Sequence, residues 1–518
     1  MKSVSFTDRE QLWQDMESGQ ANEWDLIVIG GGITGAGILR EAVRIGYKSL
    51  LIEQRDFAWG SSSRSSKMVH GGLRYLAAGN ISLTRDALQE REKLIAEAPR
   101  LVERLGYYFP LYKKRFPPRI AAAILFWLYD RLAGIRDHRR VSNRQLGQVF
   151  DQLDTGKTNG AFYYTDAVTD DARLTLRVLQ ESVRAGGYLR NYTRATELIR
   201  KDDRVTGLLA EDTETGRKLS LNARVVINAT GAWADRLGNA ALAGMKIRPQ
   251  RGSHLIVSAE KFPLADAIFM LHPEDNRRLF VYPWEGRTII GTTDIFHERN
   301  LDTAASITAE ELDFLLLAAA QLYPERTPAR EDVISSWSGV RPIITSGKSR
   351  DPSKASREHQ VWVETGMVSC SGGKLTTFHH MAQDVIAKAR QFLPAGSKPS
   401  GNRIFSPHSL GGGDILPQDP ERGDRLLGRY GQDAAELLHS APEHEHEAIP
   451  GTRTCLAQAR WALRHEAVLH LDDLMLRRTR LGLLLENGGE EVLQDIRRIA
   501  TDVRAWSAEQ WEDEVKRY

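Results

Sequence analysis

A glycine-rich turn near the N-terminus has the residue types and spacing that bind the diphosphate of a dinucleotide. The apolar run Asp25 to Ile29 is followed by Gly30, Gly32 and Gly35, and then by a stretch with helical periodicity. The first glycine permits a tight turn, the second lets the backbone approach the pyrophosphate, and the third lets helix and strand pack closely. The helix N-terminus then faces the phosphates. The sequence therefore predicts a dinucleotide-binding strand, turn and helix.

A carboxylate follows at the spacing that ribose recognition requires. The next predicted strand, Ser49 to Ile52, delivers Glu53. An acidic side chain about 20 residues beyond the glycine turn accepts hydrogen bonds from the adenosine ribose. Glycine turns without a ligand are common, but the two strands and Glu53 together favour a nucleotide site.

Two further strand-to-glycine segments favour FAD over NAD. Arg224 to Gly231 resembles the second such element of flavoproteins of the two-dinucleotide-domain type, which a plain NAD dehydrogenase does not need. Ser369 to Thr376 ends a strand and opens a helix, whose N-terminus could stabilise negative charge on a reduced flavin. The expected cofactor is FAD, bound by a Rossmann-like α/β domain.

Six segments in matching order resemble those of aerobic FAD-dependent glycerol-3-phosphate dehydrogenases, and the resemblance covers nearly the whole chain from Trp24. They are Ser61 to Tyr75, Arg251 to His254, Ile290 to Asp294, Trp337 to Pro342, Gly372 to Thr377 and Arg477 to Gly482. The resemblance implies oxidation of sn-glycerol 3-phosphate to dihydroxyacetone phosphate by hydride transfer to N5 of FAD. It also implies that membrane quinone accepts the electrons.

Fixed arginines suit a phosphate-bearing substrate, because one guanidinium can bind two phosphate oxygens. The candidates are Arg74, Arg341 and Arg357, followed by Arg277 or Arg278. Arg74 follows two glycines and Arg341 precedes a proline, so constrained loops hold both, whereas an isolated arginine is more often a surface salt bridge. Arg357 departs from the family pattern Thr-Arg-Asp-Tyr, since this chain has Ser-Arg-Glu-His there.

Proton removal from the substrate hydroxyl needs a base whose pKa lies near the operating pH, and histidine suits that role. His254 is the first choice, with a hydrogen-bonded core histidine as the alternative. His70 lies in the predicted flavin-proximal loop, and Tyr75 could bind substrate or simply pack. The remaining expected cofactor contacts are Ser65, Ser66, Gly71, Gly231, Gly339, Gly373, Lys374 and Leu375, although the serines could form a plain loop and Lys374 could decorate a helix start.

The elements that position these residues divide into three parts. Residues 24–398 form the FAD-dependent oxidoreductase region, with FAD-binding segments at about 24–105, 160–245 and 330–398. An antiparallel β-rich substrate domain is expected at about 106–159 and 246–329. After a Pro- and Gly-rich break, residues 403–518 show helical spacing, which predicts an all-helical C-terminal domain.

Composition narrows the function class. A net charge of +2 in 518 residues gives no case for nucleic acid. Cys370 and Cys455 are too few and too far apart for a disulfide framework or a metal cage, so no metal site is expected and a reducing compartment is the simplest interpretation. The N-terminus lacks the order of a secretory signal.

An apolar stretch between two basic clusters suggests contact with a membrane surface. Ile120 to Tyr129 is too short to span a bilayer, which takes about 20 residues. The flanking cations are Lys113, Lys114, Arg115, Arg119, Arg131, Arg136, Arg139 and Arg140. A helix of this kind could lie among anionic headgroups, with an ordinary buried helix as the alternative. We expect peripheral attachment through about 113–140, on the inner face of the cell membrane in the cytoplasm.

Rival functions remain open at this stage. An oxidase would use the same flavin and substrate but reduce oxygen, an amine or amino-acid oxidase would bind a carboxylate, and a flavin-bound regulatory protein would not turn over. The sequence does not separate quinone from oxygen, identify the proton acceptor or assign a role to the C-terminal domain. It leaves the oligomeric state open, a homodimer among the options.

Overall fold

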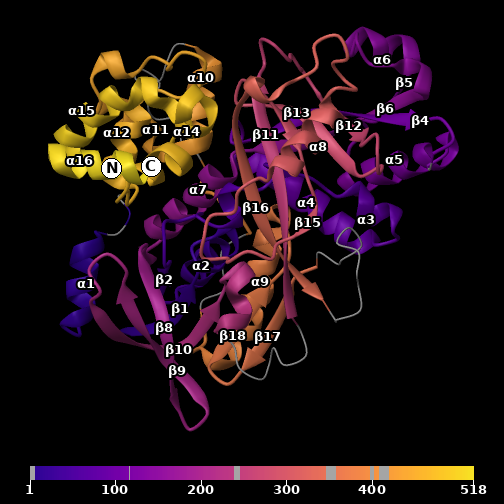
Figure 1. Cartoon of the computed structure of the whole chain (residues 1–518). Coiled ribbons are helices and arrows are strands. Elements are labelled where there is room, and N and C mark those ends of the chain that lie inside the picture. The colour runs from indigo at the N-terminus through magenta and orange to yellow at the C-terminus, as the bar shows by residue number, and fades with distance from the viewer. Residues whose placement is uncertain are drawn as a thin grey trace.

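The computed structural model describes residues 6, 8–115, 117–237, 246–345, 358–396, 402–407 and 419–518. Two β-sheets face each other across the centre of the molecule, and a helical domain packs at one side (Figure 1). The architecture is the expected one, with a dinucleotide-binding α/β part, an antiparallel β-rich part and a helical C-terminal part. The site lies where the two sheets meet.

The first sheet carries the dinucleotide turn on its central strand. Its strands are β1 (Glu23–Ile29), β2 (Ser49–Ile52), β7 (Tyr188–Arg190), β8 (Thr193–Lys201), β9 (Arg204–Asp212), β10 (Lys218–Asn228), β17 (Gln360–Glu364) and β18 (Met367–Ser371). The order is β17-β18-β10-β1-β2-β7, and the strands from β18 to β7 run parallel. Because parallel strands end at the same edge, the turns after β1, β2, β10 and β18 converge there.

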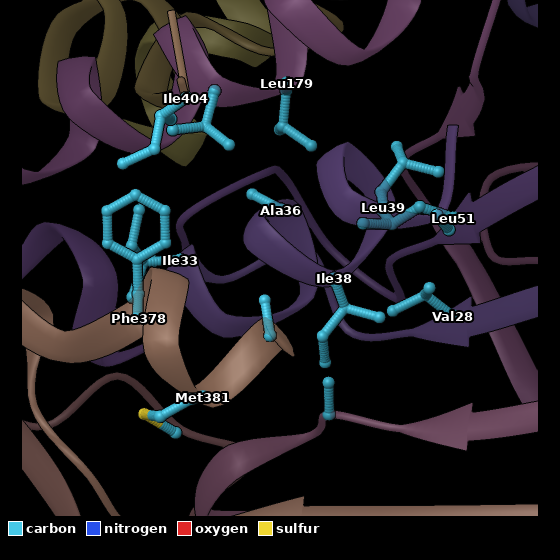
Figure 2. Close-up of a cluster of buried hydrophobic side chains, with 14 of the residues drawn as sticks. Val28, Ile33, Ala36, Ile38, Leu39, Leu51, Leu179, Phe378, Met381 and Ile404 are labelled. Carbon is cyan, nitrogen blue, oxygen red and sulfur yellow. The ribbon is translucent and has the colours of Figure 1, made fainter. Parts of the chain in front are cut away.

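Helix α2 (Ile33–Ile45) is buried between this sheet and two neighbouring helices, α7 (Asp171–Arg184) and α9 (Phe378–Ala389). Figure 2 shows its apolar side chains between strand residues on one side and Phe378, Met381 and Leu179 on the others. Even the charged Arg40 and Glu41 of this helix are buried, and Arg40 donates to the carbonyl oxygen of Ile404 at 2.8 Å. This packing fixes the start of α2, which opens the dinucleotide turn.

The second sheet is antiparallel apart from one pairing, β4 with β12. Its strands are β3 (Met68–Val69), β4 (Val102–Tyr112), β5 (Arg139–Val141), β6 (Thr158–Thr169), β11 (Lys246–Ser258), β12 (Ala267–Leu271), β13 (Arg278–Trp284), β14 (Arg287–Gly291), β15 (Ile295–Phe296) and β16 (Val333–Thr345). A hairpin turn at Glu285-Gly286 joins β13 and β14.

Three strands, β3, β6 and β16, lie in the second sheet although the sequence placed them with the FAD-binding segments. β16 pairs with β11 along almost its whole length, and β6 pairs with β4. The sequence did not reveal these partners, because pairing between distant segments depends on tertiary packing. These strands therefore connect the two parts of the oxidoreductase region.

The remaining helices before the C-terminal domain pack against one of the two sheets or against each other. They are α1 (Arg9–Glu17), α3 (Leu73–Ala77), α4 (Ile81–Glu97), α5 (Arg119–Ala133), α6 (Asn143–Val149) and α8 (Ala309–Ala319). Within the described segments, no helix combines the length and apolar character needed to cross a bilayer.

Residues 419–518 are helical, which confirms the expected class of the C-terminal domain. The helices are α10 (Pro420–Tyr430), α11 (Ala434–His439), α12 (Leu456–His465), α13 (Leu471–Asp473), α14 (Leu481–Leu484), α15 (Leu493–Arg504) and α16 (Ala508–Arg517). A widened π-helical turn, Leu474–Arg478, lies between α13 and α14. In Figure 1 this domain and α5 lie at opposite sides of the molecule.

Candidate active site

A cavity of about 2140 Å³ opens at the carboxyl edge of the parallel strands and extends to α5. The turns after β1, β2, β10 and β18 line one end of it. Ligands of open α/β sheets bind at this edge. The position predicted from the sequence therefore coincides with a large cavity in the described part of the chain.

The dinucleotide turn has space only for glycine at two positions. Gly30 has a φ of +115°, and a Cβ there would lie 2.6 Å from the Ala229 carbonyl oxygen. A Cβ on Gly35 would lie 1.9 Å from the carbonyl oxygen of Gly30. These contacts bring β1, α2 and β10 together as the fingerprint requires. Gly30 and Gly32 line the cavity, while Gly35 does its work in the packing beneath it.

Glu53 supports the turn as well as facing the cavity. One carboxylate oxygen accepts the Gly31 N–H at 2.7 Å and the other accepts the Arg55 N–H at 2.9 Å. Burial raises the pKa of Glu53, and the two backbone donors oppose that shift. Each oxygen keeps a second lone pair for a ribose hydroxyl.

A dinucleotide fits the groups present at this end. The first residue of α2 follows Gly32, which offers no side-chain cap, and the Ile33 N–H donates to the Ser62 hydroxyl at 2.8 Å. The helix start, with its positive partial charge, therefore faces the cavity beside a serine. Gly231 has a φ of +61° and open space where its side chain would be. The glycine turn from Gly30 to Gly35, which we name the dinucleotide cradle, would hold the diphosphate together with the helix start. Glu53 would hold the adenosine.

Two cations, one from α3 and one from the turn after β18, form a cluster around Tyr75. The Lys374 ammonium lies 3.6 Å from the centre of the Tyr75 ring, and the Arg74 guanidinium lies 6.0 Å from it. Gly72, with a φ of +82°, lets the loop turn here, because a Cβ would lie 2.4 Å from the Tyr75 ring. All of these residues line the cavity. The cluster therefore joins α3 to the turn after β18.

Arg341 lines the same cavity from β16. Its guanidinium pairs with Asp294 at 3.1 Å and donates to the Thr292 hydroxyl at 3.3 Å. Its side chain lies over Gly252, where a Cβ would be 2.6 Å from a guanidinium nitrogen. Two neighbours thus orient the planar group, as anion recognition by arginine requires.

His254 does not line the cavity. It is buried behind Ser66, with Nε2 hydrogen-bonded to the Ser66 hydroxyl at 2.9 Å. Its ring stacks on Trp337 at 4.7 Å between centres. Burial, followed by the nearby Arg341 and Lys67, lowers its pKa well below the ordinary 6.5. The side chain is therefore neutral at neutral pH, and Ser66 separates it from the cavity.

His70 lines the cavity directly and belongs to a tightly held loop. Its backbone N–H donates to the Thr376 hydroxyl at 3.1 Å. The next N–H, from Gly71, donates to the Tyr129 hydroxyl at 2.9 Å, and Tyr129 donates to Asp166 at 2.7 Å. Gly71 therefore faces α5 and not the cavity. Tyr129 and Asp166 were not singled out in the sequence, because their partners are about 60 to 95 residues away.

The other expected residues fall into two groups. Those that line the cavity are Ser65, Ser66, Gly231, Gly339, Gly373, Leu375, Arg277 and Arg278. Gly339 is required by close packing, since a Cβ would lie 2.1 Å from the Arg64 carbonyl oxygen. Arg357 lies outside the described residues. In the described ranges, no group of three or more His, Cys, Asp or Glu side chains could hold a metal.

Most of the chain matches two known family models. Residues 25–387 match the family of FAD-dependent oxidoreductases, and residues 365–511 match the C-terminal domain of alpha-glycerophosphate oxidase. The chain is 31% identical over 508 residues to the aerobic glycerol-3-phosphate dehydrogenase of Staphylococcus aureus strain USA300, covering 92% of this chain and 90% of that protein.

Solved structures agree with these matches. The glycerol-3-phosphate dehydrogenase of Bacillus halodurans, solved in complex with FAD, is 27% identical and superposes with a TM-score of 0.76 over 96% of this chain and 95% of that one. The FAD-bound L-alpha-glycerophosphate oxidase of Mycoplasma pneumoniae, at 16% identity, reaches 0.59 over 74% of this chain and 98% of its own. Glycine oxidase of Bacillus cereus, at 18% identity, reaches 0.55 over 72% and 98%. The last two share the fold alone.

Proposed function

Because the chain belongs to the FAD-dependent oxidoreductase family, and within it to the aerobic glycerol-3-phosphate dehydrogenases, we propose that it oxidises sn-glycerol 3-phosphate to dihydroxyacetone phosphate. The electrons then pass to membrane quinone. FAD, when bound, accepts the two electrons of an alcohol oxidation at its isoalloxazine ring. The observation that carries the proposal is that Arg74, Arg341 and Lys374 line the same cavity as the dinucleotide cradle.

These cations suit a phosphate ester. Arg341 is held by Asp294 and Thr292, and Arg74 follows the constrained glycines of its loop. Bidentate contacts from such fixed guanidinium groups match the tetrahedral oxygens of a phosphate dianion. The alcohol carbon would then be held at a defined distance from the part of the cavity that receives the flavin ring, which we name the flavin end. Fixing this geometry accelerates hydride transfer. Arg357 remains a candidate for the same site.

Two histidines are candidates for the proton acceptor. His254 remains the expected base, and its contact with Ser66 adds a condition, because the serine hydroxyl would have to relay the proton. His70 needs no relay, since it lines the cavity itself. A base must reach the proton within hydrogen-bond distance or through one intermediate. Variants of Ser66 separate the two routes, because only the His254 route passes through that hydroxyl.

The far end of the cavity suits an apolar electron acceptor. There the walls come from α3, α4 and α5, and we name the set the apolar arm: Leu73, Leu76, Leu83, Ala121, Leu125 and Leu128. A quinone ring is flat and apolar, and pockets for such ligands are lined mainly by hydrophobic side chains. The arm connects the cationic end of the cavity to the helix expected to meet the membrane.

Helix α5 has two different faces. Phe126 and Tyr129 are buried against β6, whereas Ile120, Ile124 and Trp127 are 77%, 60% and 57% exposed. Exposed cations flank the helix on both sides, as the sequence shows. A helix with one apolar face among cations lies in the headgroup region of an anionic bilayer. We infer peripheral attachment through residues 113–140, which places the mouth of the apolar arm at the membrane surface.

Comparing electron acceptors tests the main rival, an oxidase. Purified holoenzyme would be supplied with glycerol 3-phosphate and either a soluble quinone analogue or oxygen. Rapid quinone reduction with little hydrogen peroxide is expected. Hydrogen peroxide formed at the full rate of turnover would replace quinone by oxygen in the proposal. Glycine and sarcosine in the same assay test the amine oxidases, whose members share the fold at low identity.

A further inference from the structure

Arg480 of the C-terminal domain reaches deep into the oxidoreductase region. Its guanidinium pairs with Asp171 at 2.5 Å and with Asp170 at 2.9 Å, and both carboxylates belong to the start of α7. All three side chains are buried. It also donates to the carbonyl oxygen of Ser63, which lies in the loop that lines the cavity. A buried charge is retained only when its partners satisfy it, as here.

The backbone at Arg480 is strained, and the side chain accounts for the choice of residue. Its φ is +65°, and it lies between the π-helical turn, which ends at Arg478, and the start of α14. Glycine is the usual residue in this left-handed region, and other residues carry a cost of about 1 to 3 kcal/mol there. Arginine at such a position therefore indicates that its charge and reach are needed.

Asp171 also binds the loop from Ser61 to Ser66, which we name the serine loop. One of its oxygens accepts both the Ser65 N–H at 2.9 Å and the Ser65 hydroxyl at 2.7 Å. The other oxygen, which binds Arg480, also accepts the buried Lys67 ammonium at 2.9 Å. Arg480 and the loop are therefore held by the same carboxylate, from its two sides.

The loop positions the groups at the cavity. The Ser65 carbonyl accepts the Trp337 indole N–H at 3.0 Å, and Trp337 stacks on His254. His254 binds the Ser66 hydroxyl, and the Ser66 carbonyl accepts the Tyr282 hydroxyl at 2.8 Å. Ser65 and Ser66 line the cavity. Every link in this series is a hydrogen bond or a stacked ring, so the loop has little freedom to move independently of Asp171.

We propose that Arg480 is a positioning residue for the oxidation, through which the C-terminal domain sets the place of Ser65 and Ser66 at the flavin end of the cavity by way of Asp171. The proposal rests on the function proposed above and adds a role for the C-terminal domain. Loss of Arg480 would let the serine loop shift, and misplacement by about 1 Å can slow a reaction on the order of a hundredfold.

A neighbouring ion pair provides a matched control. Arg425 of α10 is buried and pairs with Glu285 of the β13–β14 hairpin at 2.6 Å, again across the border between the domains. Glu285 keeps a second cation, Arg429, when Arg425 is removed. Asp171 likewise keeps Lys67 when Arg480 is removed. Arg425→Gln therefore removes one buried ion pair across the border, whereas Arg480→Gln removes two, and of these two arginines only Arg480 binds Asp171 and the carbonyl oxygen of Ser63.

The test compares Arg480→Gln with Arg425→Gln in the full-length holoenzyme. The rate of flavin reduction by glycerol 3-phosphate would be measured without oxygen at saturating substrate, together with FAD content and thermal stability. Arg480→Gln is expected to slow reduction by about tenfold or more, which corresponds to about 1.4 kcal/mol in the barrier, while Arg425→Gln stays within about twofold of the wild type. Arg480→Lys, which keeps one charge, should fall between.

Ser65→Ala in both backgrounds shows whether the effect passes through the loop. If it does, Ser65→Ala slows the wild type but adds little to Arg480→Gln, because groups in one network are not additive. If Arg480→Gln yields no holoenzyme, the same cycle is run on Arg480→Lys. Equal rates in the Arg480 and Arg425 variants, or full additivity with Ser65→Ala, would overturn the proposal. Failure of the wild type to be reduced would instead overturn the proposed function, so the two outcomes are distinct.

Discussion

Replacing two exposed apolar residues of α5 that lie outside the cavity tests the membrane attachment most sharply. Ile120 and Trp127 are 77% and 57% exposed, and neither lines the cavity. The double variant Ile120→Gln/Trp127→Gln removes apolar surface while keeping residues that suit a helix. The fold and the site should therefore remain intact, and only the affinity for the bilayer should fall.

The exposed fractions set the size of the effect. Full burial of a large apolar side chain contributes about 1.5 to 3 kcal/mol. Scaled by exposure, the two side chains together contribute about 2 to 4 kcal/mol if the bilayer covers them fully, which corresponds to roughly 30- to 1000-fold in the binding constant. Partial coverage lowers these numbers, so at least about a tenfold loss is expected.

Sedimentation of the holoenzyme with vesicles of mixed zwitterionic and anionic lipid measures this loss. Leu317→Gln is the control, because Leu317 is 42% exposed on α8, away from the basic clusters. The double variant should bind at least about tenfold more weakly, and the control should bind like the wild type. Both should reduce a soluble quinone analogue at the wild-type rate. Equal vesicle binding by the double variant and the wild type would refute attachment through α5.

Three other changes have defined outcomes. Arg341→Lys should raise the KM for glycerol 3-phosphate about tenfold or more, because an ammonium cannot replace the planar fork, and an unchanged KM would remove Arg341 from the phosphate site. Gly35→Ala should abolish FAD retention, since its Cβ would lie 1.9 Å from the Gly30 carbonyl oxygen; a variant that holds FAD normally would contradict the packing described. His254 is kept neutral by its lowered pKa, so its contribution to stability is complete above its ordinary pKa of about 6.5 and is lost as the pH falls below it. His254→Gln should therefore lessen the acid loss of stability in thermal unfolding at pH 5 against pH 8, and an unchanged difference would speak against a neutral His254.

The local features of the site could be predicted from the sequence because they depend on neighbouring residues. The turn at Gly30 to Gly35 and the position of Glu53 follow from spacing along one strand, turn and helix. The constrained position of Arg74 could likewise be predicted from Gly71 and Gly72, which precede it. In each case the chemistry and the backbone conformation are encoded within a few residues.

The features that were missed depend on contacts between distant segments. Arg480 meets Asp170 and Asp171 across about 310 residues, and nothing in either segment alone reveals the pairing. The burial of His254 behind Ser66 joins segments 188 residues apart. The short motif predicted His254 as the base but did not show whether the side chain reaches the cavity, because packing decides that. The apolar arm also arises from three helices that are separate in sequence.

The proposed reaction is the oxidation of glycerol 3-phosphate by the flavin of this chain. The most direct measurement adds glycerol 3-phosphate to the purified holoenzyme without oxygen and follows the visible band of the oxidised flavin. Rapid bleaching is expected, with one dihydroxyacetone phosphate formed for each FAD. A band that persists, or one that bleaches with glycine or sarcosine and not with glycerol 3-phosphate, would contradict it.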